Sequence, residues 1–146
     1  MRRYGDVPRQ DKTYRPRPGV YAVLQRGSDV LLTHQNGLQA EFQLPGGGID
    51  PGEHPLQSLH REVYEETGWR IGPARRIGVH RRFVYMPEYD LWAEKICTIY
   101  LARPTCRLGP PTEAGHSAVW MPLILAADLV ASTGDAAALR RLAGQG

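Results

Sequence analysis

Three glutamates stand close together in the stretch REVYEETGW, which covers residues 61–69. At about 100° per residue of an α-helix, Glu62, Glu65 and Glu66 fall within a sector of about 100° and form one carboxylate patch. Like charges at this spacing destabilise a helix by roughly a few tenths of a kcal/mol per pair. Clustered carboxylate oxygens are, however, the ligands that Mg²⁺ or Mn²⁺ prefers. The patch is therefore either a solvated acidic face, with Arg61 pairing Glu65, or a divalent metal site.

A helix over residues 55–67 is expected to hold this patch. Apolar residues recur there at helical spacing: Leu56, Leu59 and Val63. Pro55 suits the first helical turn and Gly68 suits the position after the last, so both ends are marked. On the helical wheel the carboxylate patch borders the apolar stripe. The sequence therefore predicts that the patch lies at the edge of the hydrophobic core.

β-rich runs surround this helix in the sequence. They are VYAVLQ, DVLLTH, ARRIGVHRRFVYM, KICTIYLAR and SAVWMPL. Only residues 26–28 separate the first two runs, which predicts a hairpin. The glycine run at residues 45–48 predicts a break in regular structure, and the Ala-rich residues 135–143 predict a closing helix. Strands around a central helix, with a second helix at the end, indicate a mixed α/β sandwich.

The length of 146 residues fits one domain with a hydrophobic core. With 42% hydrophobic residues the chain is too apolar for the disordered class. No apolar run approaches the roughly 18 residues of a membrane span, and the basic start MRRYGDVPRQ lacks the apolar stretch of a secretory signal. We therefore expect a cytoplasmic protein with no membrane partner. Residues 1–18 carry arginines among prolines and are predicted to form a basic arm.

Arginine supplies nearly all of the positive charge. The net charge is +3, and Lys12 and Lys95 are the only lysines. A guanidinium binds phosphate through two parallel hydrogen bonds, which fits a phosphorylated ligand. A GC-rich genome also encodes arginine-rich chains, so the arginines support this interpretation without establishing it.

The wider spacing resembles the signature box of the Nudix hydrolase family. The matching positions are Gly47, Glu53, Arg61, Glu62, Val63, Glu65, Glu66, Gly68 and Trp69. The family usually has an aliphatic residue where this chain has Trp69. The resemblance implies a Nudix-type α/β/α sandwich with a central mixed β-sheet, formed by residues 19–146.

The resemblance also implies a metal centre. The implied ligands of Mg²⁺ or Mn²⁺ are Glu62, Glu65, Glu66 and the carbonyl of Gly47. Glu53 stands just ahead of the helix and can reach Arg61, so these two are expected to be structural support for the ligands. Glycines at 46–48 let the backbone approach a metal or ligand closely. No Gly-Lys-Ser/Thr follows them, which excludes a P-loop.

The implied reaction is attack of water on a diphosphate linked to another group, usually a nucleoside. The residues expected to be catalytic are Glu62, Glu66 and Glu113. The general base is left open among Glu62, Glu94 and Glu113, because family members place it either in the box or on a later loop. Glu113 is preferred as an auxiliary residue, since with His116 it resembles the acidic loop that many relatives place over the site.

The substrate class depends on residues outside the box. Tyr14-Arg15-Pro16 and Tyr85-Met86-Pro87 resemble the bacterial branch that cleaves dinucleoside polyphosphates or removes pyrophosphate from RNA 5′ ends, although that branch often has glutamine where this chain has Gly46. Tyr85 is either a platform that stacks on a base or an aromatic of the core at the end of a strand. The residues expected to bind substrate are Arg15, Arg81, Arg82, Tyr85 and Lys95.

Other functions are compatible with the same sequence. A nucleotide-sugar (ADP-ribose type) or nucleoside triphosphate pyrophosphatase would use the same box. A non-catalytic nucleotide sensor would be expected to lose the box glutamates, and all are present. The arm could also make the chain a basic RNA-binding module. The expected partners are a nucleotide-type small molecule, an RNA 5′ end as one option, and a second copy in a homodimer as another.

Overall fold

The computed structural model describes residues 1–36 and 41–144. Its elements in chain order are β1 (Arg2–Arg3), β2 (Arg15–Arg26), β3 (Asp29–Gln35), β4 (Glu41–Gln43), β5 (Gly46–Gly48), α1 (Pro55–Thr67), β6 (Trp69–Ile71), β7 (Arg75–Met86), the short 3₁₀ helix η1 (Pro87–Tyr89), β8 (Leu91–Ala102), β9 (Pro104–Arg107), β10 (His116–Pro122), α2 (Leu123–Leu129) and α3 (Thr133–Leu142). The larger sheet has the order β1-β7-β8-β2-β3-β10. β4 pairs with β3, β5 pairs with β2, and β6 and β9 form a separate pair.

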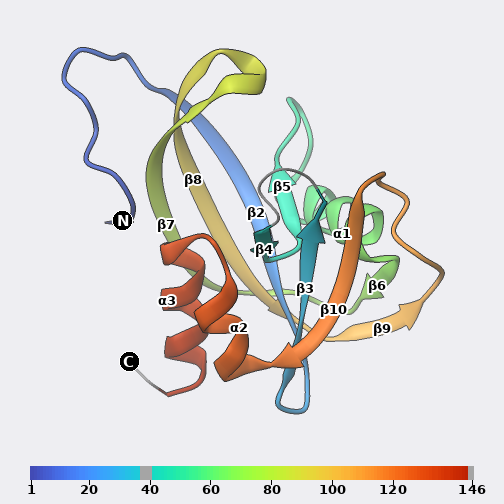
Figure 1. The fold of residues 1–146 in the computed structure, drawn as a ribbon. Coiled ribbons are helices and arrows are strands. Elements are labelled where there is room, and N and C mark those ends of the chain that lie inside the picture. Colours follow the sequence, from blue (N-terminus) through green and yellow to red (C-terminus); the bar gives the residue numbers. More distant parts are fainter. Residues whose placement is uncertain (37–40, 145–146) are drawn as a thin grey trace.

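Helices cover both faces of the larger sheet (Figure 1). On one face α1 packs through the buried Leu59 and Val63, and on the other α2 and α3 pack through residues that include Ala126 and Leu139. β2 runs parallel to β8, whereas β7 is antiparallel to β8. The sheet is therefore mixed, and the predicted α/β/α sandwich with a central mixed sheet is confirmed.

Helix α1 has the predicted bounds, Pro55–Thr67. At its start the Leu56 N–H donates to Nδ1 of His54, at 3.1 Å. At its end Gly68 takes the left-handed conformation, with φ of 77°. Glu66 is only 8% exposed, whereas the Glu65 side chain is 37% exposed. The carboxylate patch thus lies at the edge of the core, as predicted.

One local prediction was wrong. The glycine run does not break regular structure, because Gly46–Gly48 pair with β2 as strand β5. A Cβ atom at Gly46 would collide with the Val20 carbonyl, so this pairing is close enough to require glycine. The predicted Ala-rich closing helix is confirmed as α3, whereas α2 just before it was not predicted. The predicted hairpin of β2 and β3 is confirmed.

A buried polar pair fixes α3 against the sheet. His80 on β7 and Asp135 on α3 are both buried, with 3.1 Å between Nε2 and Oδ1. A Cβ atom at Gly134 would collide with the His80 ring, so the helix lies close against β7 here. The contact offsets part of the cost of burying two polar side chains, although Nδ1 of His80 has no hydrogen-bond partner among the described residues.

The N-terminal segment contacts the sheet at two places. β1 pairs in parallel with β7, and β2 begins at Arg15, inside the predicted arm. The division into an arm and a domain remains a prediction. In the described part of the chain no helix combines the length and the apolar character that crossing a bilayer requires.

Candidate metal centre and substrate cavity

Helix α1 and the loop before β10 bring carboxylates together. Ligand atoms of Glu62, Glu65 and Glu113 lie within 4.8 Å of one another. A second group, Glu66, Glu113 and His116, meets the same limit. Because both groups contain Glu113, the helical patch and the loop form one continuous acidic site. Its oxygen-rich donor set fits a hard divalent cation such as Mg²⁺ or Mn²⁺.

Backbone hydrogen bonds dock residues 108–115 on the end of α1. The Glu65 carbonyl accepts from the N–H groups of Thr112 and Glu113, at 2.9 and 3.0 Å, and the Gly68 carbonyl accepts from the Leu108 N–H, at 2.9 Å. Carbonyls at a helix C-terminus lack intrahelical partners, so the loop supplies donors that the helix needs. The docking places Glu113, with its side chain 47% exposed, beside the patch.

Arg61 is the cation that holds the patch. Its Nε and Nη2 donate to the two carboxylate oxygens of Glu53, at 2.8 and 3.0 Å. Its Nη1 donates to Glu62 and to Glu65, at 3.2 Å each, and Nη2 donates to Asp50 at 3.4 Å. The hydrogen bonds from Arg61 lower the pKa of Glu53 to about 2, and in return they raise the pKa of Arg61. Both side chains of this pair therefore stay charged.

Glu66 is the most deeply buried carboxylate of the site. Its Oε1 accepts a hydrogen bond from the Gly46 N–H, at 3.1 Å. Burial raises the pKa of Glu66 to about 8, against the opposing effect of the Gly46 N–H. Burial also raises the pKa of Glu62, while the charge of Arg61 opposes this shift. A divalent cation would favour the ionised carboxylates, since it attracts their charge.

Two predicted substrate contacts line a cavity on the α3 side of the sheet. Arg82 and Lys95 face each other across β7 and β8 and line a cavity of about 210 Å³, together with Tyr21 and Asp135. Burial, and then the charge of Arg82, lower the pKa of Lys95. Tyr21 also packs against Gly46, whose N–H binds Glu66. The cavity therefore adjoins the acidic site through Tyr21 and Gly46.

The other predicted substrate contacts do not line this cavity. Arg81 pairs with Glu94, at 3.8 Å, and Arg15 is exposed at the start of β2. Tyr85 is 42% exposed and donates a hydrogen bond to Asp90, at 2.6 Å, so it is not a core aromatic. Glu94 belongs to neither carboxylate group in the described part of the chain.

Tyr21 and Asp135 are among the cavity residues that were not predicted from the sequence. The alternation in VYAVLQ does place Tyr21 on the face opposite Val20 and Ala22. That pattern says nothing of the partner that α3 brings to this face, which is Asp135. Finding it required the position of α3.

The protein family of this chain follows from a match to a known family model. The family model described as NUDIX domain matches residues 14–142, which include the acidic site and the cavity. The chain belongs to the NUDIX family. The family resemblance of the signature box is thereby confirmed.

Curated relatives of this NUDIX chain match over shorter stretches. The RNA pyrophosphohydrolase of Photorhabdus laumondii is 45% identical over 58 residues, which are 40% of this chain and 32% of that protein. The RNA pyrophosphohydrolase of Pectobacterium atrosepticum is 36% identical over 74 residues, 51% of this chain and 41% of that protein. The matches thus span well under half the length of these relatives.

Solved NUDIX structures share the fold over most of the chain. The MutT NUDIX hydrolase of Burkholderia pseudomallei has a TM-score of 0.68 and 22% identity, and the match covers 86% of this chain and 97% of that one. The MutT protein of Bacillus halodurans has a TM-score of 0.69 and 18% identity, with 85% and 80% covered. At these identities the likeness establishes the fold alone.

The three glycines of β5 should respond differently to alanine. A Cβ atom at Gly47 would lie 2.8 Å from the Glu62 carboxylate, whereas at Gly48 the nearest atom, on Arg17, is 3.9 Å away. We expect Gly47→Ala to fold and to weaken Mn²⁺ binding about tenfold or more by displacing Glu62. Gly48→Ala should change neither property. Gly46→Ala should lower the unfolding free energy by about 2 kcal/mol or more, because its Cβ meets backbone.

Calorimetric Mn²⁺ titration and urea unfolding of the three variants measure these two properties separately. Equal Mn²⁺ affinity in Gly47→Ala and Gly48→Ala would show that Glu62 does not depend on Gly47.

Glu66 should make stability fall as pH rises when EDTA removes divalent metal. Its pKa is about 8 in the folded chain against an ordinary 4.5. Between these values the folded state holds a proton that the unfolded state has lost, so each pH unit lowers the unfolding free energy by up to about 1.4 kcal/mol. Glu66→Gln carries no such proton.

The difference in unfolding free energy between Glu66→Gln and the wild type should therefore grow with pH from about 5 to 8. Urea unfolding in EDTA across this range measures it. A constant difference would contradict the raised pKa of Glu66.

Proposed function

We propose that this NUDIX domain is a metal-dependent pyrophosphohydrolase. Its substrate is a nucleoside diphosphate linked to a further group, with an RNA 5′ end or a dinucleoside polyphosphate as the favoured forms. The observation that carries the proposal is the pair of carboxylate groups that share Glu113. Such a concentration of negative charge, beside a cavity lined by Arg82 and Lys95 as well as Glu41 and Asp135, has a clear use if a divalent cation and a phosphorylated substrate bind there.

The metal would be held by the carboxylates of Glu62, Glu65 and Glu66 and by the carbonyl of Gly47. Mg²⁺ or Mn²⁺, when bound, supplies charge neutralisation on the diphosphate and lowers the pKa of a bound water. Arg61 keeps the two more exposed carboxylates, Glu62 and Glu65, in place by donating to both. The Gly46 N–H does the same for Glu66.

The chain's own groups can also move a proton. Glu113 is exposed enough to meet water, and it reaches both carboxylate groups. His116 Nε2 lies 3.7 Å from Glu113 Oε1, and the His116 side chain is only 8% exposed. A carboxylate between solvent and the acidic site suits a general base, and the neighbouring imidazole can fix its orientation.

Substrate phosphates would be attracted by the cavity cations. Arg82 and Lys95 face the same cavity, and a guanidinium can bind a phosphate through two hydrogen bonds. Arg17 is a further candidate, because its Nη2 lies nearest to the Gly48 position. The binding roles of Arg15, Arg81 and Tyr85 remain part of the proposal, at the far end of the nucleotide.

The names of the partial relatives favour an RNA 5′ end, since they are RNA pyrophosphohydrolases. Dinucleoside polyphosphates, nucleotide sugars and nucleoside triphosphates present the same linkage and are the alternatives. Screening these four classes with Mg²⁺ and identifying the products distinguishes them. A non-catalytic nucleotide sensor would bind members of this panel without forming any product.

Glu66→Gln is expected to abolish hydrolysis while the fold is kept. Glutamine retains the oxygen that accepts from Gly46, but it cannot supply the charge that a cation needs. We expect turnover of the best substrate to fall at least about 100-fold. Steady-state kinetics measure the loss, with circular dichroism to verify folding and Glu88→Gln, an exposed carboxylate on η1, as the control. Unchanged turnover in folded Glu66→Gln would disprove the metal-site assignment.

Glu113→Gln should lower kcat about 100-fold or more with little change in KM, as loss of a general base does. The control is the isosteric substitution Glu94→Gln. It removes the carboxylate of another candidate base, which pairs with Arg81. We expect near-normal kcat there. If kcat fell only in Glu94→Gln, the general base would be Glu94 on β8. If kcat fell in neither variant, Glu62 would be the remaining candidate for the general base.

A further inference from the structure

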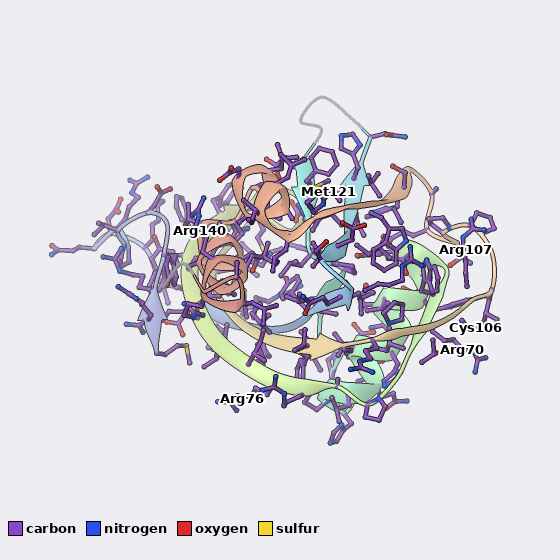
Figure 2. The ribbon with its side chains drawn as sticks, turned by 90° about the horizontal axis from the view of Figure 1, so that it is seen from below. Arg70, Arg76, Cys106, Arg107, Met121 and Arg140 are labelled. Atoms are coloured by element: carbon purple, nitrogen blue, oxygen red, sulfur yellow. The ribbon has the colours of Figure 1, made fainter. Side chains whose placement is uncertain are left out.

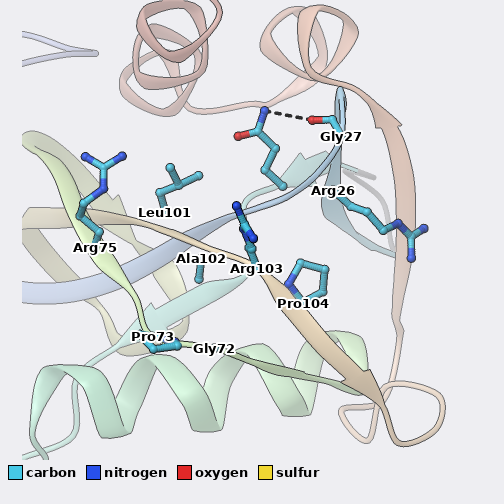
Figure 3. A pocket seen from close by; sticks show the side chains of 10 residues that line it. Arg26, Gly27, Gly72, Pro73, Arg75, Leu101, Ala102, Arg103 and Pro104 are labelled. Carbon is cyan, nitrogen blue, oxygen red and sulfur yellow. Dashed lines mark hydrogen bonds between the residues drawn. The ribbon is translucent and has the colours of Figure 1, made fainter.

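A second cavity lies at the other end of the sheet, where β2 and β8 finish. Its volume is about 790 Å³, and Arg26, Arg75 and Arg103 line it with Pro73, Leu101 and Ala102. In Figure 3, Arg75 and Arg103 stand on the two sides of Leu101 and Ala102, whereas Arg26 extends away from them. Arg26 is held by Trp120, with 4.0 Å between the guanidinium carbon and the ring centroid. Arg75 and Arg103 are therefore the cations that a ligand would meet here.

No carboxylate neutralises these two arginines in residues 1–36 and 41–144. The sequence explains why. It holds no acidic residue between Glu66 and Glu88, nor between Glu94 and Glu113. These two stretches form β6, β7, most of β8 and β9. The one acidic residue on the adjoining hairpin is Asp29, whose strand partner is Arg26.

The strand pair β6–β9 connects this cavity to the acidic site. At one end the Gly68 carbonyl accepts from Leu108, next to the docked loop that carries Glu113. At the other end Gly72, which lines the cavity, donates to the Arg103 carbonyl at 3.0 Å. Extended chain rises about 3.3 Å per residue, so the pair spans only about 13 Å.

Exposed arginines also lie along this strand pair. Arg70 on β6 pairs with Cys106, and the exposed Arg107 on β9 pairs with Trp69, so the two arginines project from opposite faces of the strand pair. Figure 2 shows both at the same side of the molecule, with Cys106 between them. The positive charge thus continues from the cavity toward the acidic site.

We propose that the cavity and the β6–β9 pair bind the phosphodiester backbone of an RNA whose 5′ end occupies the acidic site. This inference rests on the proposed function and selects RNA among its substrates. The exposed arginines come from separate elements and are spread out between the cavity and the acidic site, which suits successive phosphates of a strand. A single small anion would instead need guanidinium groups that converge on one point. Contacts of this kind read charge, so binding is independent of base sequence.

The double variant Arg75→Ala/Arg103→Ala tests the inference with triphosphorylated RNAs of two lengths. Hydrolysis of a dinucleotide should stay within about twofold of wild type, since it cannot span to the cavity. For an RNA of about twelve nucleotides, kcat/KM should fall about tenfold, and its logarithmic salt dependence should become shallower by about 0.7 for each phosphate that the variant no longer neutralises. Arg2→Ala/Arg140→Ala removes the same charge elsewhere and is the matched control.

Loss of activity on both lengths, or an equal loss in the control variant, would overturn the inference. The first outcome would indicate a general defect, and the second an effect of net charge alone. The inference would also be overturned if the double variant cleaved the longer RNA as efficiently as wild type does. In these three cases hydrolysis by the wild type leaves the proposed function intact.

A binding measurement separates the inference from the catalytic proposal. Fluorescence anisotropy in EDTA, with a 5′-hydroxyl RNA of about the same length, needs neither metal nor a cleavable bond. The double variant should bind this RNA about tenfold more weakly than wild type, even if no hydrolysis is ever detected. Competition by ATP is the second arm. If ATP displaces the bound RNA from wild type as effectively as competitor RNA of the same length does, the surface binds small nucleotides and the RNA assignment is overturned.

Discussion

Repulsion between carboxylates is the constraint around which this structure is organised. Glu62, Glu65 and Glu66 occupy one sector of α1, and Glu66 is buried there. Arg61 offsets part of the repulsion by donating to two of them, and Glu53 holds Arg61 through two hydrogen bonds. The guanidinium of Arg61 is thus held in place by the protein's own carboxylates. The carboxylates remain close in a geometry that local stability alone would oppose.

The backbone around α1 serves the same constraint. β5 consists of three glycines and lies against both β2 and the carboxylates, where larger residues would displace Glu62 or collide with backbone. The loop before β10 satisfies the last carbonyls of α1 and in doing so delivers Glu113. Each of these contacts removes an unsatisfied polar group and also positions an acidic side chain. Folding and site assembly therefore use the same hydrogen bonds.

Local features of the sequence predicted helix α1 and the position of the carboxylate patch on it. Helical periodicity, Pro55 and Gly68 defined α1, and the wheel placed the patch at the core edge. The rest depends on contacts between distant residues. A run of glycines is compatible with a turn and with a closely packed strand, so strand β5 was not predicted. The charge of Glu113 is visible in the sequence, but its approach to Glu65 depends on how residues 108–115 dock, which no local pattern encodes.

Strand β2 explains how opposite charges can be concentrated in one small domain. Val20, Ala22 and Leu24 face the α1 layer, whereas Tyr21 and Val23 face the α2 and α3 layer. The carboxylates cluster beside the first layer, and Arg82 and Lys95 line a cavity in the second. Between them stands Tyr21, packed on Gly46. A phosphorylated ligand at this boundary would meet cations from one layer and carboxylates from the other.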